Sequence, residues 1–249
     1  MITQQTTTVH QSGSLNRRVS VVIALYNYER YIAETLDSVA AQTTRDVAII
    51  VVNDCSTDNS LNVAAEWMRH NQHTGIGMLL LSNDENAGAS IARNNGITAA
   101  QSEFCFLLDA DNLLYPRCLE KHLAAIDSRP NVDAAYSLIE VFEGDRELFG
   151  AGVFAKEGLI HGNFIDLMAL YRRSTLLALN GFEKIQYGWE DYDLWLRMLE
   201  GDSIVLHIPE ITARYRHHYS SITRTEQKSS NVLDLHKDMT RRHPWLKLQ

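Results

Sequence analysis

Two carboxylates at the end of an apolar run form the most chemically informative feature of this sequence. The stretch from Phe104 to Asn112 reads FCFLLDADN, which puts Asp109 and Asp111 directly behind the apolar residues. Such a run is typical of a strand buried on both faces of a parallel sheet. Carboxylates there lose hydration free energy unless a partner compensates them. Because a hard divalent cation commonly binds one or two carboxylates together with substrate phosphates, the pair predicts a metal-dependent site for a phosphorylated substrate.

The elements that must position this pair alternate between strands and helices. Strands are predicted at Val19–Leu25, Ala48–Val52, Met78–Leu81 and Phe104–Leu108, and helices at Glu29–Ala41, Asn59–His70, Ala87–Ala100 and from Pro116 onward. This order is typical of a mostly parallel α/β sheet with crossover helices.

In open sheets of this kind, ligands bind beyond the carboxyl ends of the strands. Polar residues follow each predicted strand: Tyr26 and Asn27, Asn53 and Asp54, residues 83–86, and residues 109–112. We therefore expect these clusters to converge on one edge of the sheet and form a ligand site there. A protein without such a site would also have polar loops, but seldom carboxylates at successive strand ends.

The second half of the sequence is less regular. Strands are predicted at 134–141, 147–154, 204–206 and 211–215, a short strand and helix within 170–180, an amphipathic helix at Trp189–Glu200 and a tail helix at Val232–Arg242. We expect Trp195 to face the core. The predicted organisation is a polar, flexible leader over residues 1–18, one domain over 19–223 and a helical tail over 224–249.

Charge and cysteine content narrow the class of protein. The net charge of −8 disfavours general nucleic-acid binding, because no excess of Lys and Arg is available to neutralise phosphates. Cys55, Cys105 and Cys118 form no C-x-x-C pair, which favours reduced thiols in a cytoplasmic protein. No apolar run approaches the roughly 20 residues that span a bilayer. Any membrane contact is therefore expected to be peripheral, at the inner membrane face.

Several motifs share their order with a known enzyme family. They are VSVVIALYN at 19–27, IVVNDCSTD at 50–58, NAGASIARN at 86–94, LDAD at 108–111, RRS at 172–174, NGFE at 180–183, WEDYDLWLR at 189–197 and YRHH at 215–218. Over residues 19–223 the chain resembles the family 2 glycosyltransferases, inverting enzymes with the fold called GT-A. The resemblance implies a Rossmann-like nucleotide-sugar-binding half at 19–115 and an acceptor-binding half at 116–223.

The resemblance also implies a reaction. Family members transfer a sugar from a nucleotide diphosphate donor to an acceptor hydroxyl with inversion, through in-line attack opposite the leaving diphosphate. The resemblance favours a UDP-sugar as the donor, because family members commonly use one. The acceptor would be a polysaccharide, a lipid-linked sugar or a protein. Such a site must hold the nucleotide, neutralise the leaving group and deprotonate the acceptor.

On the donor side, the resemblance assigns Ala24 and Tyr26 to the base pocket and Asp54 to the base and ribose. Ala24 stands where the family usually has proline. Either Asp54 or Asp58 would alternatively cap the following helix, and we expect Asp54 to bind and Asp58 to cap. Arg93 resembles the donor-contacting arginine of the family, although an ordinary surface arginine on a helix would fit the same pattern.

Around the leaving group, the resemblance assigns Asp111 as a direct ligand of Mn²⁺ or Mg²⁺ and Asp109 as a ribose contact that reaches the metal through water. A metal there stabilises charge on the leaving diphosphate. Asn112 replaces a second aspartate that is common in the family. His218 matches the histidine of the Tyr-Arg-x-His segment, which contacts the metal or the diphosphate. Residues 220–224 are expected to form a loop over the donor.

On the acceptor side, Asp191 matches the second acid of the family's Glu-Asp motif and is the candidate general base. Its position in the first turn of a helix favours the ionised carboxylate, although acids are common there for the dipole alone. Glu190 would orient the acceptor or the base. The resemblance assigns Gly181, Phe182, Trp189 and Glu190 to acceptor binding, and the alternative for Trp189 is core packing.

Two other functions fit parts of this pattern. A nucleotidyltransferase that makes a sugar nucleotide also uses a strand-end aspartate and a metal, but its early loop would carry glycines and basic residues for the triphosphate. The loop from Leu25 to Arg30 contains no glycine. A non-catalytic binding protein could share the fold, but it would not need both the D-x-D pair and the Glu-Asp pair.

Overall fold

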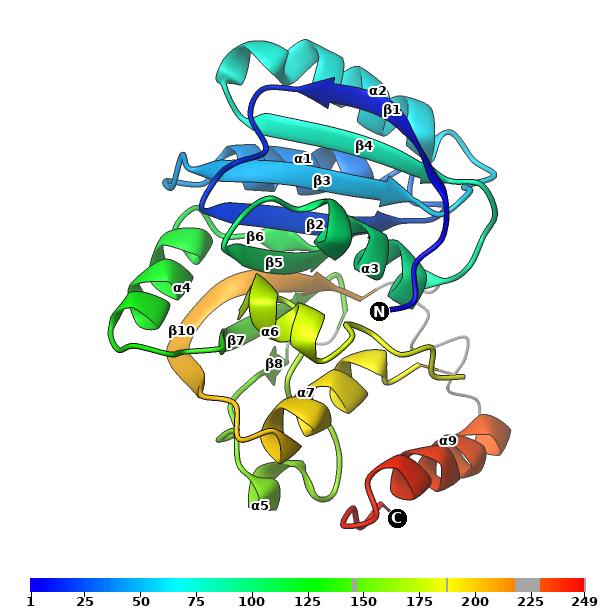
Figure 1. Ribbon diagram of the computed structural model, residues 1–249, viewed down its shortest axis with the longest axis vertical. Helices are drawn as coiled ribbons and strands as arrows, with labels where there is room; N and C mark the ends of the chain where they lie inside the picture. The colour runs from blue at the N-terminus through cyan, green and yellow to red at the C-terminus, as the bar shows by residue number, and fades with distance from the viewer. Residues whose placement is uncertain (145–146, 187, 218–228, 249) are drawn as a thin grey trace.

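The described strands form one ten-stranded mixed sheet (Figure 1). The computed structural model describes residues 1–144, 147–186, 188–217 and 229–248. The strand order is β1-β4-β3-β2-β5-β9-β7-β10-β6, and β8 pairs with β7. The strands are β1 (Thr6–Ser12), β2 (Val19–Leu25), β3 (Val47–Asn53), β4 (Gly77–Asn83), β5 (Phe104–Asp109), β6 (Leu113–Leu114), β7 (Ala134–Phe142), β8 (Leu148–Phe149), β9 (Ala169–Arg172) and β10 (Val205–Arg216).

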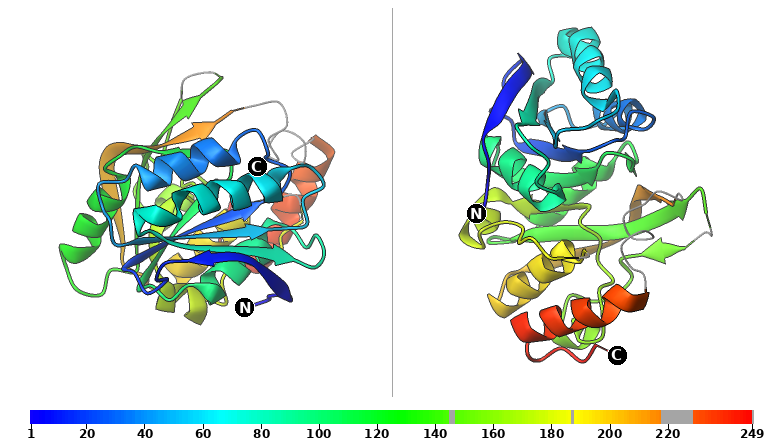
Figure 2. Two further views of the ribbon diagram at one scale, coloured as in Figure 1. Left: turned by 90° about the horizontal axis from the view of Figure 1, so that it is seen from above. Right: turned by 90° about the vertical axis from the view of Figure 1, so that its right-hand side faces the viewer.

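Helices cover both faces of this sheet (Figure 2). They are α1 (Ile32–Ala40), α2 (Ser60–Asn71), α3 (Ala89–Ala99), α4 (Cys118–Asp127), α5 (Lys156–Leu159), α6 (Arg173–Ala178), α7 (Glu190–Glu200) and α9 (Ser229–Arg242), with a 3-10 turn η1 (Gln72–Thr74). Val21 and Val22 are neighbours in β2, yet Val21 belongs to the core on the side of α1, α2 and α4, and Val22 belongs to the core on the side of α3, α6, α7 and α9. This layering confirms the predicted α/β class. None of the helices in the described ranges is long and apolar enough to cross a membrane.

Strands β4, β3, β2 and β5 are parallel neighbours, as predicted. Every residue of β3 is buried, which explains its uninterrupted apolar sequence. Helix α3 approaches β2 closely at Gly96, where a Cβ atom would lie 2.4 Å from Cγ1 of Val22. The shared direction brings the carboxyl ends of these strands to the same edge of the sheet, beside the start of α3.

The first residues of the chain extend the sheet, where the sequence predicted a flexible leader. β1 pairs antiparallel with β4 at the sheet edge, with Thr6 opposite Asn83 and Ser12 opposite Met78 (Figure 1). Its side chains are exposed or half-buried. The strand therefore lacks an apolar pattern and is held through the backbone hydrogen bonds of an edge.

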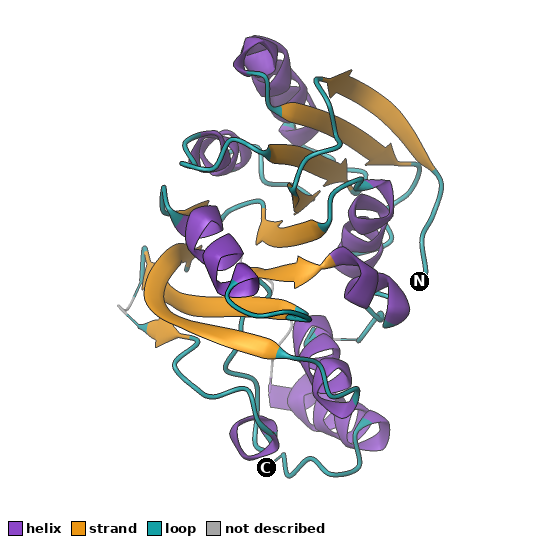
Figure 3. Cartoon of the chain, turned by 60° about the vertical axis from the view of Figure 1, so that its left-hand side comes forward, coloured by secondary structure: helices purple, strands orange, loops and turns teal. Residues whose placement is uncertain are grey.

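The second half differs from the prediction in two strands. The segments expected at 204–206 and 211–215 form one strand, β10, parallel to β7, with register shifts between Ile208 and Ala213. Pro209 lies within β10 and has no N–H group to donate, which explains an interrupted ladder there. Of the strand expected at 147–154, only Leu148–Phe149 pairs with β7. The tail forms α9 as predicted, beside α7 (Figure 3).

Candidate active site

The strand-end residues meet beyond the carboxyl edge of the parallel strands, as their common direction requires. Asp54 follows β3, and it accepts a hydrogen bond of 2.6 Å from Nδ2 of Asn83 at the end of β4. Ala24 lies opposite Asp109 in the ladder between β2 and β5. Tyr26, directly after β2, is 42% exposed and so available to a ligand at this edge.

Asp54 is almost fully buried, and groups of the chain itself already donate hydrogen bonds to its carboxylate. Besides Asn83, the backbone N–H groups of Ala87 and Gly88 donate to it at 3.1 and 2.7 Å. Asp54 thereby fixes the turn that starts α3, where Gly88 has a φ of 96°. A carboxylate has lone pairs for further donors, so the donor-binding role assigned to Asp54 stays a prediction.

Asp58 acts on the helix that follows β3. Its Oδ1 accepts from the N–H of Ser60, the first residue of α2, at 2.9 Å, and its Oδ2 accepts from the N–H of Glu29 at 3.1 Å. Burial acts to raise the pKa of Asp58, but these hydrogen bonds lower it overall. Asp58 therefore stabilises the start of α2, which is the capping role expected for it.

Arg93 joins the two halves of the site. It lies on α3, and its side chain is 7% exposed. Its Nη2 donates to Oδ1 of Asp109 at 2.8 Å, and its Nη1 donates to Oε1 of Glu190 at 2.7 Å. Burial acts to lower the pKa of Arg93, but the two carboxylates outweigh it and raise the pKa above its ordinary value. Arg93 is a buried cation that bridges the D-x-D pair and the Glu-Asp pair, and not an ordinary surface arginine.

Asp191 lies in the first turn of α7, behind Trp189, which has a left-handed backbone with φ of 70°. Its Oδ1 accepts from the N–H of Tyr192 at 2.7 Å, and its Oδ2 accepts from Nδ2 of Asn163 at 3.0 Å. Burial and the negative charge of Glu190 raise the pKa of Asp191 to about 7. A carboxylate with that pKa changes protonation state near neutral pH, as suits a general base.

Asp166 is an acid of this site that the sequence analysis missed. It lies between α5 and β9, where its Oδ1 accepts from the N–H of Met168 at 2.8 Å. Burial and the negative charge of Asp109 raise the pKa of Asp166 to about 8, and Asp191 acts in the same direction. Asp166 belongs to none of the motifs and follows no predicted strand, so no sequence signal would have found it.

Arg216, at the end of β10, holds the loop that carries the D-x-D pair. Its Nε donates to the backbone oxygen of Asp111 at 2.9 Å, and its N–H donates to Oδ1 of Asn112 at 2.9 Å. The guanidinium also forms ion pairs with two glutamates. Asp111 is buried beside Tyr28, and burial together with the charge of Asp111 raises the pKa of the Tyr28 hydroxyl. Sequence reasoning missed Arg216, although it lies inside the Tyr-Arg-His-His motif.

Asp109 and Asp111 supply the carboxylate oxygens that Mg²⁺ and Mn²⁺ prefer. Across the described ranges, no group of three or more His, Cys, Asp or Glu side chains could hold an ion. Two carboxylates nevertheless fit an ion whose remaining ligands are diphosphate oxygens and water. His218 and residues 220–224 lie outside the described residues.

Two residues assigned to the acceptor lie in the interior. Phe182 is 1% exposed, and its backbone N–H and oxygen bond to the side chain of Asn94 at 2.8 and 2.9 Å. The guanidinium carbon of Arg93 lies 5.4 Å from the centre of the Phe182 ring. At Gly181 a Cβ atom would lie 2.3 Å from Oδ1 of Asn94. Phe182 therefore packs against Arg93 and Gly181 against Asn94 within the fold, and neither presents a side chain to an acceptor in this conformation.

The two tryptophans of this region have different surroundings. Trp195 is fully buried, which confirms its predicted place in the core. Trp189 is half-buried and stacks on His236 of α9, with ring centres 5.4 Å apart and 24° between the planes. The tail helix therefore covers one face of Trp189, and Tyr192 packs edge to face with the same ring.

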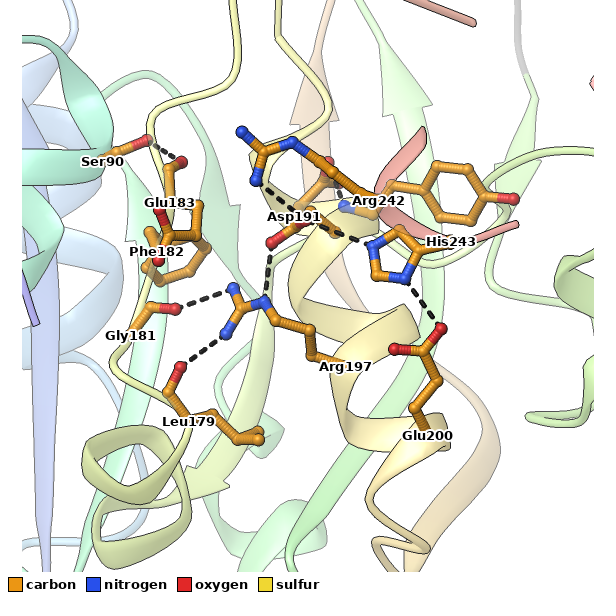
Figure 4. Close-up of polar contacts among 12 residues, drawn as sticks. Ser90, Leu179, Gly181, Phe182, Glu183, Asp191, Arg197, Glu200, Arg242 and His243 are labelled. Atoms are coloured by element: carbon orange, nitrogen blue, oxygen red, sulfur yellow. Dashed lines mark hydrogen bonds and ion pairs between the residues drawn. The ribbon is translucent and has the colours of Figure 1, made fainter. Parts of the chain in front are cut away.

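A polar network ties α7 to the rest of the second half (Figure 4). Arg197 donates to the backbone oxygen of Gly181 at 2.8 Å and pairs with Asp193 at 2.7 Å. His243, which follows α9, lies between Asp193 and Glu200 at 3.2 and 2.8 Å. The network therefore fixes the helix whose first turn carries the Glu-Asp pair.

Comparisons with known proteins agree with this geometry. The family model described as "Glycosyl transferase family 2" matches residues 20–178. EpsE of Bacillus subtilis (strain 168), provisionally named as a glycosyltransferase, is 28% identical over 194 residues, which are 74% of this chain and 67% of that protein.

Solved structures share the fold at low sequence identity. The complex of S. aureus TarS with UDP-GlcNAc has a TM-score of 0.76 and 18% identity, and the match covers 90% of this chain and 66% of that one. The mannosyltransferase PcManGT from Pyrobaculum calidifontis, in complex with GDP-Man and Mn²⁺, has a TM-score of 0.66 and 19% identity over 94% of this chain and 67% of that one. The chain thus spans about two thirds of the length of these relatives. Because the family model matches well over half of its residues, the chain belongs to glycosyl transferase family 2, a family of glycosyltransferases with the GT-A fold.

Proposed function

We propose that this chain is an inverting transferase that moves a sugar from a nucleotide diphosphate sugar to an acceptor hydroxyl. The Arg93 bridge carries the proposal, because one buried cation joins Asp109 of the D-x-D pair to Glu190, the residue next to the candidate base Asp191. In-line displacement needs the nucleophile and the breaking bond held in a fixed relation across the reacting carbon. A rigid link between the two halves of the site supplies that relation.

A UDP-sugar is the donor that we favour. TarS was solved with UDP-GlcNAc and with UDP, and PcManGT with GDP-Man. We assign Ala24 and Tyr26 to the base, Asp54 to the base and ribose, Asp109 to the ribose and Arg93 to a contact with the donor, because all five belong to the elements that meet at this edge of the sheet. The acceptor would be a saccharide, a lipid-linked sugar or a protein in polysaccharide or glycoconjugate synthesis.

The reaction forms one bond to the anomeric carbon as another breaks. The acceptor oxygen attacks that carbon, the bond to the diphosphate oxygen breaks, and its electron pair leaves with the diphosphate. The hydroxyl proton passes to Asp191. Because the hydroxyl becomes acidic only as it attacks, a carboxylate with a pKa of about 7 is a competent acceptor for a late proton transfer. Burial and, after it, the negative charge of Glu190 keep that pKa raised.

Mn²⁺ or Mg²⁺ fits the leaving-group side through Asp111, with Asp109 beside it and His218 as a further candidate ligand. When bound, the ion would neutralise charge on the leaving diphosphate. Arg216 keeps Asp111 in a defined loop through the backbone contacts described above. Mn²⁺ in the PcManGT complex supports this assignment by fold similarity.

Release of nucleoside diphosphate from UDP-, GDP- and dTDP-sugars tests the proposal. We expect one donor to be turned over only with a divalent metal, and faster with a saccharide acceptor. Asp191→Asn should bind that donor normally and suppress transfer. The proposal is wrong if no donor is consumed with any acceptor, or if Asp191→Asn keeps near-normal turnover.

A further inference from the structure

The candidate base is held by a residue that none of the sequence motifs contains. Asn163 lies in the segment 160–168, and its Nδ2 donates to Oδ2 of Asp191 at 3.0 Å. We propose that Asn163 is a positioning residue that fixes the direction of the Asp191 carboxylate. The inference rests on the proposed function, because it takes Asp191 as the base.

The chain sets the orientation of the Asn163 amide. Its Oδ1 accepts from the N–H of Ile165 at 3.1 Å, within a turn of the segment. Because a backbone N–H only donates, the amide oxygen faces Ile165 and the NH₂ group faces Asp191. A flipped amide would lose both hydrogen bonds. The donor directed at Asp191 is therefore built into the local turn.

Both oxygens of Asp191 are oriented by donors. Tyr192 holds Oδ1 through its backbone N–H at 2.7 Å, and Asn163 holds Oδ2 at 3.0 Å. Each carboxylate oxygen can accept more than one hydrogen bond, so a lone pair stays available for the acceptor proton. Two fixed contacts prevent rotation of the carboxylate before the acceptor arrives, which lowers the entropic cost of reaching the reactive geometry.

This segment is itself anchored to α7 and to the end of the chain. The Tyr192 hydroxyl donates to the backbone oxygen of Leu159, the last residue of α5 and the one directly before this segment. The N–H of Lys247 donates to the oxygen of Ile160 at 2.8 Å, and the His161 ring bonds to the oxygen of Lys247 at 3.1 Å. The residues after α9 therefore help to hold the segment that orients the base.

The charged groups that act on Asp191 come from several elements. Glu190 lies on α7, Arg93 on α3, Asp109 at the end of β5 and Asp166 in the same segment as Asn163. In addition to these charges, the hydrogen bond that Asn163 donates to Oδ2 favours the ionised carboxylate of Asp191, because a hydrogen bond to the charged form lowers the pKa. Loss of that donor should raise the pKa of Asp191 further.

Two substitutions at Asn163 separate positioning from folding. Asn163→Asp keeps an acceptor for the N–H of Ile165 but replaces the donor with a negative charge, whereas Asn163→Ala removes both contacts. We expect kcat to fall about 10- to 100-fold in each variant, with donor binding unchanged, because a hydrogen bond to a charged group is lost. The acid limb of the kcat–pH profile should move to higher pH, and further for Asn163→Asp than for Asn163→Ala.

His161→Ala is the matched control, because it loosens the same segment without touching Asp191. If Asn163 only supported the fold, Asn163→Asp would keep normal kcat and an unmoved pH profile, and Asn163→Ala would behave like His161→Ala. Either result overturns the positioning role. Should Asn163→Ala fail to fold, Asn163→Asp decides. An inactive Asp191→Asn beside a normal Asn163→Asp would refute only the positioning role, whereas an active Asp191→Asn would refute the proposed function.

Discussion

Arg93 and Glu190 are 97 positions apart in the chain, and their side chains form an ion pair of 2.7 Å. The same guanidinium donates to Asp109 at 2.8 Å. Because α3 belongs to the first half and α7 to the second, this contact couples the D-x-D pair to the helix that carries the candidate base. Several measurable consequences depend on that coupling and on the groups around it.

Replacement of Arg93 should impair both stability and activity. Arg93→Ala leaves Asp109 and Glu190 without their shared cation. We expect the free energy of unfolding to fall by about 3 kcal/mol, which is the lower end of the range for a broken buried ion pair. The lower end applies because both carboxylates are partly exposed. Arg93→Lys should fold better but transfer poorly, since an ammonium does not present the two divergent N–H groups of a guanidinium. Urea unfolding and kcat/KM measure the two effects.

The control for Arg93→Ala is Arg117→Ala, which removes the ion pair that Arg117 forms with Glu120 on the surface of α4. Exposed pairs of this kind contribute little to stability. Equal losses of unfolding free energy at the two positions would show that the bridge is not a structural link.

Asp111→Asn should weaken the binding of UDP in the presence of Mn²⁺, because an amide offers a neutral oxygen where a carboxylate would hold the ion. We expect a loss of about tenfold or more in metal-dependent affinity and little change in metal-free affinity. Isothermal titration calorimetry with and without Mn²⁺ separates the two. Asp58→Asn is the matched control, since asparagine also caps helices well; equal behaviour of the two variants would argue against a metal role for Asp111.

The pH dependence of transfer should report the protonation of Asp191. Its pKa is raised to about 7 by burial and by Glu190, and the base must be ionised to accept a proton. We therefore expect kcat at saturating donor to be constant above about pH 8 and to fall about tenfold per unit well below pH 7. Donor binding measured at each pH isolates the chemical step. A kcat that stays flat from about pH 5.5 to 8 would contradict the assignment.

His243 should make the docking of the tail depend on pH. Burial acts to lower the pKa of His243, but Asp193 and Glu200 raise it above 6.5 overall. A raised histidine pKa contributes stability that is complete below the unfolded-state pKa and is lost as the pH rises through the folded-state pKa. His243→Gln should therefore lower Tm most at pH 6 and progressively less at alkaline pH.

Thermal unfolding as a function of pH, with the exposed His70→Gln as control, measures the contribution of His243. A Tm difference between wild type and His243→Gln that grows with rising pH would have the wrong sign for this linkage.

The parallel half of the fold could be predicted because its signals are local. The predicted strand at Val19–Leu25 coincides with β2, because a mostly apolar run is typical of a strand that is covered on both faces of the sheet. Parallel direction then forces the strand ends to one edge, so Asp54 and Asp109 were expected there. β1 was not predicted, because a polar edge strand is held by hydrogen bonds of the backbone. Every residue has these backbone groups, so they leave no pattern in the sequence.

The sequence alone identified which carboxylates were candidates for chemistry: Asp109 and Asp111 because they follow a buried apolar run, and Glu190 and Asp191 because their motif resembles that of the family. Only the tertiary structure decided which side chains surround them. Asn163 and Asp166 reach the site from a segment without a local signal, Arg216 contacts the Asp111 loop only in the folded chain, and Arg93 becomes a bridge only where α3 and α7 approach each other. Burial and neighbouring charge, which raise the pKa of Asp191, are properties of that packed arrangement and have no counterpart in the order of residues.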